Sequence, residues 1–153
     1  MQNNDVLRQI RYIFNYSDDQ MIALFIQADV VVAREIVSFW LKKEEDEAYQ
    51  EMKDIELATF LNGLINLKRG KKEGPQAIPE TELNNNIIFR KLKIALNFKD
   101  IDILEVFDLV DLKVGKHELS ALFRNPNQSQ YRECQDQFLR NFLYGLKMKF
   151  RPN

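Results

Sequence analysis

Residues 3–25 read NNDVLRQIRYIFNYSDDQMIALF, and residues 85–107 read NNIIFRKLKIALNFKDIDILEVF. Both stretches begin with an asparagine pair and carry apolar residues at helical spacing, with a break at Asn15 in one and at Asn97 in the other. Asparagine tolerates the left-handed conformation that often ends a helix, and the SDDQ run that begins at Ser17 has the spacing of a capping box. Each stretch is therefore predicted to hold two helices.

The same similarity extends over most of the chain. A shift of 82 positions aligns residues 3–70 with residues 85–152 without insertion or deletion, and about 18 of the aligned residues are identical. Gly63 and Gly145 align with each other inside an apolar helical stripe. A glycine inside a helix costs up to about 1 kcal/mol, so its presence in both copies predicts a close helix crossing at this point.

The repeat predicts an all-α fold of two tandem four-helix units. Their expected boundaries are 1–70 and 85–153, and the glycine- and proline-containing segment 71–84 is the expected linker. In the second helix of the first unit, the predicted apolar stripe is Met21, Ile22, Phe25 and Ala28. The predicted N-caps are Asn4 for the first helix, and Asp54 and Asp136 for the fourth helix of the two units.

Composition favours a packed protein that stays in the cytoplasm. Hydrophobic residues make up 45% and charged residues 29% of the chain, which is typical of a globular domain. No apolar run approaches the roughly 18 residues of a membrane span, and the N-terminus lacks a signal-peptide pattern. The single cysteine, Cys134, aligns with Met52 and is predicted to be a buried apolar residue.

The sequence shows no set of residues typical of catalysis, metal binding or cofactor binding. His117 is the single histidine, and Glu35 stands at its position in the first copy. The acidic run 44–47 lacks the glycine-containing loop pattern that wraps calcium, and no glycine cluster has a phosphate-binding pattern. We therefore expect no cofactor and no enzymatic activity, although a large polar pocket lined by unpaired carboxylates would favour an enzyme.

One arrangement suggests nucleic-acid binding. Residues 18–43 and 100–125 have the length and apolar spacing of a helix-turn-helix with a turn of four or five residues. The third helix would then present polar and basic residues suited to phosphates or base edges. These residues are Arg34, Ser38, Lys42 and Lys43 in the first copy, and Lys116, His117, Ser120 and Arg124 in the second. Helix pairs with short turns are also ordinary packing units.

Charge is divided unequally between the copies. The whole chain has a formal charge of −1, but residues 3–70 carry −4, residues 85–152 carry +4 and residues 71–84 carry −1. This division supports two hypotheses. In the first, the basic second copy contacts nucleic acid. In the second, the oppositely charged copies attract each other, in a homodimer or in a complex with another protein.

The doubled NN pair, the WLKK and LFRNP segments and the FLNGL and FLYGL segments together resemble the YehS family of bacterial proteins. The resemblance covers essentially the whole chain. It implies a tandem domain of unknown function in a bacterial cytoplasmic setting, and it supplies no activity, ligand or catalytic residue. The sequence therefore predicts a non-catalytic binding or regulatory module with the two hypotheses above left open.

Overall fold

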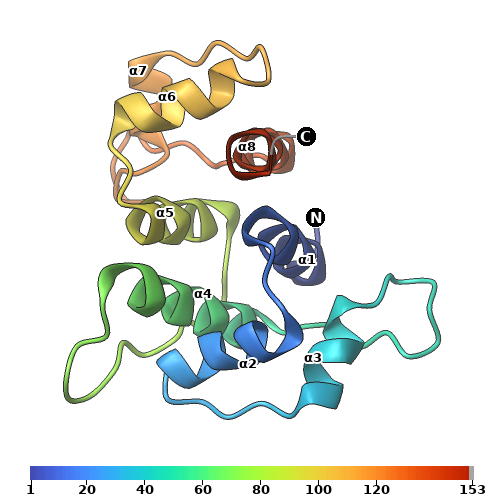
Figure 1. The fold of residues 1–153 in the computed structure, drawn as a ribbon. Helices are drawn as coiled ribbons and strands as arrows, with labels where there is room; N and C mark the ends of the chain where they lie inside the picture. The colour runs from blue at the N-terminus through green and yellow to red at the C-terminus, as the bar shows by residue number, and fades with distance from the viewer. Residues whose placement is uncertain (152–153) are drawn as a thin grey trace. The chain divides into compact units, whose positions relative to one another are not determined.

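The computed structural model describes residues 1–151, and every regular element in this range is an α-helix. The chain separates into two compact units, Met1–Leu83 and the residues from Asn84 onward. Each unit is built from four helices (Figure 1). The prediction of an all-α fold with two tandem four-helix units is confirmed.

The helices of the two units occupy matching positions of the repeat. The first unit contains α1 (Asn3–Phe14), α2 (Asp18–Gln27), α3 (Arg34–Leu41) and α4 (Asp54–Arg69). The second unit contains α5 (Asn85–Leu96), α6 (Asp100–Asp108), α7 (Lys116–Ala121) and α8 (Asp136–Phe150). The helices α6, α7 and α8 are each shorter than their counterparts in the first unit.

Three helix ends follow the local sequence signals. Asn15 ends α1 and Asn97 ends α5, each with a φ of 55° in the left-handed region. Before α2, the Gln20 amide donates to the Ser17 hydroxyl, and the Ser17 amide donates to the Gln20 side-chain oxygen at 2.8 Å. These bonds satisfy amides that have no partner inside the helix, so the predicted capping box and the two left-handed asparagines are confirmed.

The three other predicted caps are wrong by one or two positions. The N-cap of α1 is Gln2, and Asn4 lies inside the helix with its side chain fully buried. Asp54 and Asp136 are the first residues of α4 and α8 and follow the true N-caps. All three side chains bind groups far away in the sequence instead of the amides of their own helix, a choice that local spacing does not reveal.

The connection between the second and third helices is longer than predicted. It spans residues 28–33 in the first unit and 109–115 in the second, against an expected four or five residues. Asp29 and Asp111 lie in the left-handed region, with φ values of 61° and 57°. Each adds a turn after the second helix of its unit, before the chain extends toward the third helix. A helix-turn-helix has a turn of three or four residues, so these helix pairs depart from that motif.

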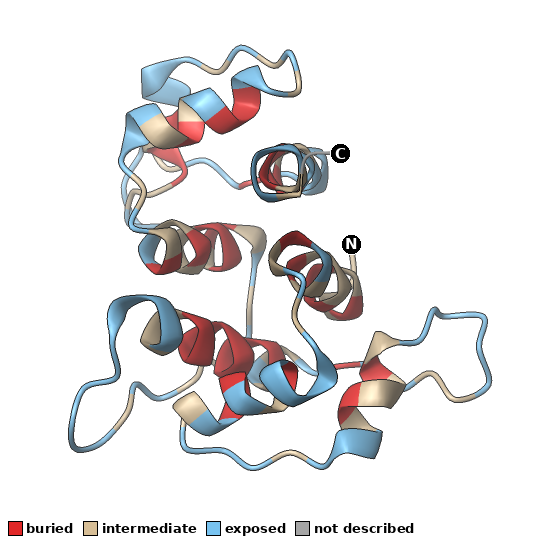
Figure 2. Cartoon of the chain, viewed as in Figure 1, coloured by how far each residue is buried: buried red, intermediate tan, exposed pale blue. Residues whose placement is uncertain are grey.

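Each helix turns an apolar side inward. Figure 2 shows buried residues along one face of the helices and exposed residues on the opposite face. In α2 the buried residues are Met21, Leu24 and Phe25, so the predicted stripe was wrong in including Ile22 and Ala28 and in omitting Leu24. Phe25 lies 5.4 Å from Phe60 of α4 between ring centroids, which joins the two helices in one aromatic core.

The close helix crossing predicted at Gly63 and Gly145 is confirmed in both units. A Cβ atom on Gly63 would lie 1.7 Å from the backbone oxygen of Leu24, and one on Gly145 would lie 2.5 Å from that of Val106. Neither oxygen belongs to a flexible side chain, so the backbone of the neighbouring helix would have to move. The glycine therefore sets how closely the second and fourth helices of each unit approach.

We predict that Gly63→Ala and Gly145→Ala destabilise the protein by about 2 kcal/mol or more, because overpacking outweighs the better helix propensity of alanine. Gly63→Ala should cost more, since its Cβ meets the backbone at the shorter distance. Urea unfolding followed by circular dichroism measures both changes. Gly115→Ala is the control, because nothing lies within 4 Å of a Cβ at that position. Equal stability of all three variants would contradict the crossing.

Candidate nucleic-acid interface

A buried asparagine in each unit holds together segments that are distant in sequence. In the second unit, the Asn86 side-chain oxygen accepts from the Cys134 amide at 2.9 Å. Its side-chain nitrogen donates to the carbonyls of Leu122 at 3.0 Å and Arg132 at 2.8 Å. The side chain of Asn86 thus joins α5, the end of α7 and the extended segment before α8.

The first unit repeats this arrangement at Asn4. Its side-chain oxygen accepts from the Met52 amide, and its side-chain nitrogen donates to the carbonyls of Trp40 and Gln50, each at 2.9 Å. Asn4 and Asn86 are 0% and 3% exposed, so these hydrogen bonds are made away from water. We call the three bonds made by each asparagine the asparagine clamp.

The loop that follows α7 is ordered by its own polar groups. The Asn127 amide donates to the Asn125 side-chain oxygen at 2.9 Å, and the Asn125 amide donates to the Gln128 side chain at 3.1 Å. The Arg132 amide then donates to the Ala121 carbonyl at 3.2 Å. Together with the clamp, these bonds fix where the loop returns alongside α7.

Between α7 and this returning loop lies an open cavity of about 530 Å³, which we call the α7 hollow. It is lined by His117, Glu118, Ala121, Arg124, Ser129, Gln130, Tyr131 and Arg132. Ala121 stands where the first unit has Phe39. The small side chain of alanine leaves room that a phenylalanine ring would occupy.

The α7 hollow is bordered by guanidinium groups that have no acidic partner. Within residues 1–151, no ion pair or hydrogen bond joins the guanidinium of Arg124 or Arg132 to another group. The carboxylate of Glu118 also lines the hollow, and it accepts from the Gly115 amide at 3.3 Å, at the start of α7. Donors that are not used inside the protein are available to an anionic ligand.

The structure brings together two of the sequence-predicted residues of the second unit. His117 and Arg124 both line the α7 hollow. Lys116 is exposed at the first position of α7, and Ser120 is half-buried on the same helix outside the lining of the hollow. The predicted set of the second unit therefore falls on one short helix and its end.

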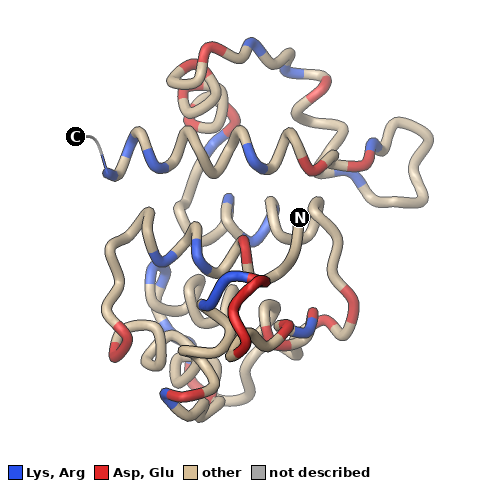
Figure 3. Tube along the Cα trace, turned by 90° about the vertical axis from the view of Figure 1, so that its right-hand side faces the viewer, with Lys and Arg blue, Asp and Glu red and all other residues tan. Residues whose placement is uncertain are grey.

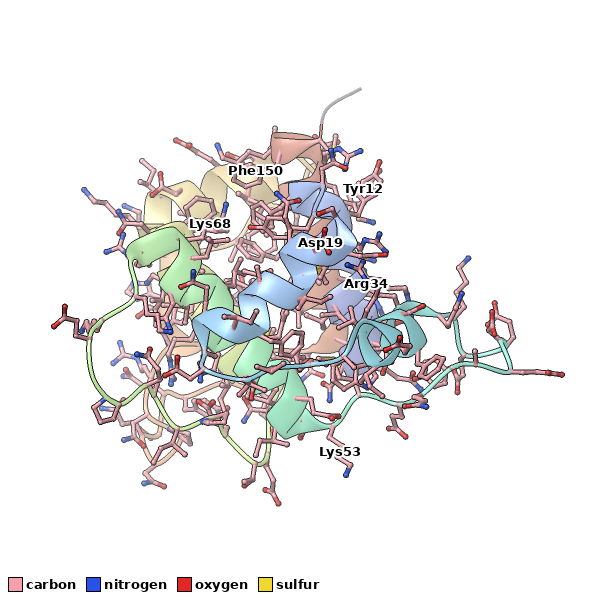
Figure 4. The ribbon with its side chains drawn as sticks, turned by 60° about the horizontal axis from the view of Figure 1, so that its bottom comes forward. Tyr12, Asp19, Arg34, Lys53, Lys68 and Phe150 are labelled. Carbon is pink, nitrogen blue, oxygen red and sulfur yellow. The ribbon has the colours of Figure 1, made fainter. Side chains whose placement is uncertain are left out.

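The predicted residues of the first unit are placed differently. Arg34 bonds to Asp19, and Figure 4 shows these two labelled side chains close to each other. The bond and charge of Asp19 raise the pKa of Arg34, and Asp18 lies 3.8 Å from the same guanidinium. Lys42 and Lys43 are exposed immediately before the acidic run 44–47. Carboxylates thus pair with Arg34, and four acidic residues follow Lys42 and Lys43 in the sequence.

Besides Glu118 on α7, sequence reasoning missed four polar residues in the loop part of the hollow: Ser129, Gln130, Tyr131 and Arg132. They lie beyond the predicted helix pair, and the Asn86 clamp brings the segment back to α7. Comparison of the two copies carries a signal of their role. Arg132 aligns with Gln50 and Ala121 with Phe39, so the lining of the hollow gains a cation at one position and loses bulk at another.

Cys134 is 5% exposed, and burial raises the pKa of its thiol to about 12. The prediction that it is a buried apolar residue like Met52 is confirmed, because Met52 is 1% exposed at the matching position. A thiol with this pKa is almost entirely protonated at neutral pH, and the protonated form is a poor nucleophile. Its contribution is to packing at the end of the clamp.

Residues 1–151 show neither a metal-binding cluster nor a membrane-spanning helix. No group of three or more His, Cys, Asp or Glu side chains in this range is placed to hold a metal ion. None of the helices in the same range combines the length and apolar character needed to cross a membrane.

The helices and the two clamps define a tandem repeat of one helical domain. Two segments of the chain, residues 3–70 and 85–151, match the family DUF1456, which is described as a protein of unknown function. The chain belongs to this family. It is 42% identical over 147 residues to the uncharacterized protein YehS of Escherichia coli (strain K12), an alignment that covers 95% of this chain and 94% of the relative. No solved structure matches. The resemblance drawn from the repeated motifs is confirmed.

We predict that Asn86→Ala destabilises the second unit by about 3 kcal/mol, because it leaves one amide and two carbonyls near the core without partners. Asn86→Asp should destabilise similarly, since a carboxylate accepts from the Cys134 amide but cannot donate to the two carbonyls. Asn127→Ala, at an exposed loop position, is the control and should lie within about 0.5 kcal/mol of the parent protein. Denaturant unfolding measures each change. Parental stability of Asn86→Ala would show that the clamp contributes little.

Proposed function

We propose that this protein is a non-catalytic binding module that contacts nucleic acid through its second unit. The observation that carries the proposal is the pair of guanidinium groups, Arg124 and Arg132, at the border of the α7 hollow without a carboxylate partner. A guanidinium presents several donors in a planar fork that matches the oxygens of a phosphate. Two such groups beside one cavity favour a phosphate-containing ligand.

The charges of the two units support the same assignment. The second unit carries +4 over residues 85–152, while the first carries −4 over residues 3–70. Acidic and basic positions occur along both units, and α8 begins with an acidic residue and ends with basic ones (Figure 3). A net positive unit raises the local concentration of a polyanion, whereas a net negative unit repels it.

Contact through the α7 hollow differs from the insertion of a recognition helix into a groove. The helix α7 has six residues, which corresponds to a length of about 9 Å. The connection before it is also longer than a helix-turn-helix turn. We infer that the end of α7 and the returning loop make the contact, while the exposed Lys116 lies nearby on the same helix and adds attraction to phosphates.

The lining of the hollow also supports a non-catalytic role. Its single carboxylate, Glu118, already accepts a hydrogen bond from the start of its own helix. Within residues 1–151, the hollow therefore holds no second carboxylate to form an acid–base pair with Glu118. A binding role requires only the donors and the aromatic rings that the hollow provides.

We predict that Arg124→Ala/Arg132→Ala weakens binding to nucleic acid by about tenfold or more. The double variant should also reduce the slope of log affinity against log salt by about 1.5, as expected for two lost phosphate contacts. Fluorescence anisotropy at several salt concentrations measures both quantities. Lys113→Ala/Arg140→Ala is the matched control, because it removes the same charge from the second unit outside the hollow. Equal losses in both double variants would reduce the contact to general electrostatic attraction, and absence of binding at low salt would refute the proposal.

Self-association is the second candidate function, and a specific exposed segment favours it. In the first unit, Ile26, Val30 and Val31 are 50%, 38% and 87% exposed at the end of α2 and in the following connection. Apolar residues gathered at one place on an acidic unit could pack against the basic unit of a second chain. The apolar surface would supply affinity, and the opposite charges would set orientation and association rate.

If this second function holds, light scattering should show a concentration-dependent dimer, and Val31→Ser should weaken it by about tenfold. High salt should slow the association modestly, since exposed charges are screened. Ile78→Ser is the control, because Ile78 is 90% exposed in the segment that follows α4 and lies outside the apolar group. A chain that is monomeric at every concentration would exclude this candidate.

A further inference from the structure

We propose that the α7 hollow binds one nucleotide of a single strand, with its phosphate at Arg124 and Arg132 and its base against Tyr131. This inference rests on the proposed function, and it names the form of nucleic acid that the second unit takes. The size of the hollow, the unbonded hydroxyl of Tyr131 and the polar groups around it point to this ligand.

The size of the hollow fits a small group better than a duplex. Its volume of about 530 Å³ lies within the range of pockets that enclose small molecules. A base within a duplex is stacked and paired, so it cannot enter a concave site without being extruded at a cost of a few kcal/mol. A single strand presents its bases already free of pairing, and sequence-tolerant binding of single strands combines basic grooves with aromatic rings.

Tyr131 lacks the hydrogen bond that its counterpart makes. In the first unit, the Tyr49 hydroxyl donates to the Gln2 side-chain oxygen at 2.5 Å. The matching residue of the second unit is Asn84, whose shorter side chain instead accepts from the Ile87 amide at 2.9 Å. Across residues 1–151, no group bonds to the Tyr131 hydroxyl. The Tyr131 hydroxyl is therefore unbonded, and this half-buried residue lines the hollow and also the neighbouring cavity beside Asn84.

The other lining residues supply complementary contacts. The ring of His117 provides a second aromatic surface, and a base can stack on an aromatic ring or on a guanidinium plane. Gln130 and Ser129 offer donors and acceptors for the edge of a base, and Glu118 offers an acceptor for an amino group. Ala121 leaves the space that these contacts require. Phosphate, ring and base-edge chemistry thus meet in one cavity of the second unit.

The test measures binding of the full-length protein to labelled strands of about 12 nucleotides, within the range of single-strand sites. An oligothymidylate, an oligouridylate and the duplex of the first with its complement serve as probes, so that DNA and RNA are compared directly. We expect at least about tenfold tighter binding of a single strand than of the duplex. Tyr131→Ala should weaken single-strand binding by about fivefold to about a hundredfold, the usual range for loss of one stacked base.

Tyr131→Phe and Tyr144→Ala separate stacking from other effects. Tyr131→Phe keeps the ring and should retain single-strand affinity. Tyr144 is 56% exposed on α8 outside the hollow, so Tyr144→Ala should also leave affinity unchanged. Thermal unfolding of each variant verifies that the fold is intact, and a Tyr131→Leu variant with parental stability replaces Tyr131→Ala if the latter unfolds. Equal or tighter binding of the duplex overturns the single-strand inference and leaves the proposed function standing. Failure of all probes to bind at low salt overturns both.

Discussion

The structure depends most on one buried amide in each unit. Asn4 and Asn86 use a side-chain oxygen and both hydrogens of the side-chain nitrogen to satisfy three backbone groups. Trp40 lies in the last turn of α3 and the other groups lie outside the helices, so these amides and carbonyls have no partner within a helix. Burying such groups without hydrogen bonds costs more than the packing around them can easily offset. The clamp therefore allows the extended segment before the fourth helix of each unit to pack against the helices.

Features fixed by local sequence were the ones that could be predicted. The capping box at Ser17 and the left-handed asparagines at Asn15 and Asn97 depend on neighbouring residues alone. The glycine crossing was visible because the repeat places Gly63 and Gly145 at one position against the helix propensity of glycine. The buried role of Asn4 was not visible, because its partners lie 36 to 48 residues further along the chain. A polar residue near a helix start has the same local signature whether it caps the helix or bonds elsewhere.

The residues of the candidate site also divide into those that local sequence predicts and those that depend on distant contacts. His117 and Arg124 could be selected from a helix face, since the periodicity of α7 and its end is readable from the sequence. Tyr131 and Arg132 reach the site because hydrogen bonds of Asn86 and Ala121 return the loop to α7. Arg34 has the same residue type as Arg124, yet Asp19 engages it across the first unit. Composition of a helix face therefore says little about which cations are free until the neighbouring elements are placed.

Both units keep the asparagine clamp, while only the second has Ala121 in place of Phe39, and this difference has a consequence for protein engineering. Both copies keep the clamp that fixes the start and end of the segment between the third helix and the fourth, whereas the side chains that face outward between these points differ. A duplicated scaffold of this kind separates the residues that hold a loop in place from the residues that the loop displays. Residues 116–132 could then be transplanted onto positions 34–50 of the first unit with Asn4 left in place. The product would be a bivalent chain, whose avidity for a long ligand would report whether both hollows can be occupied together.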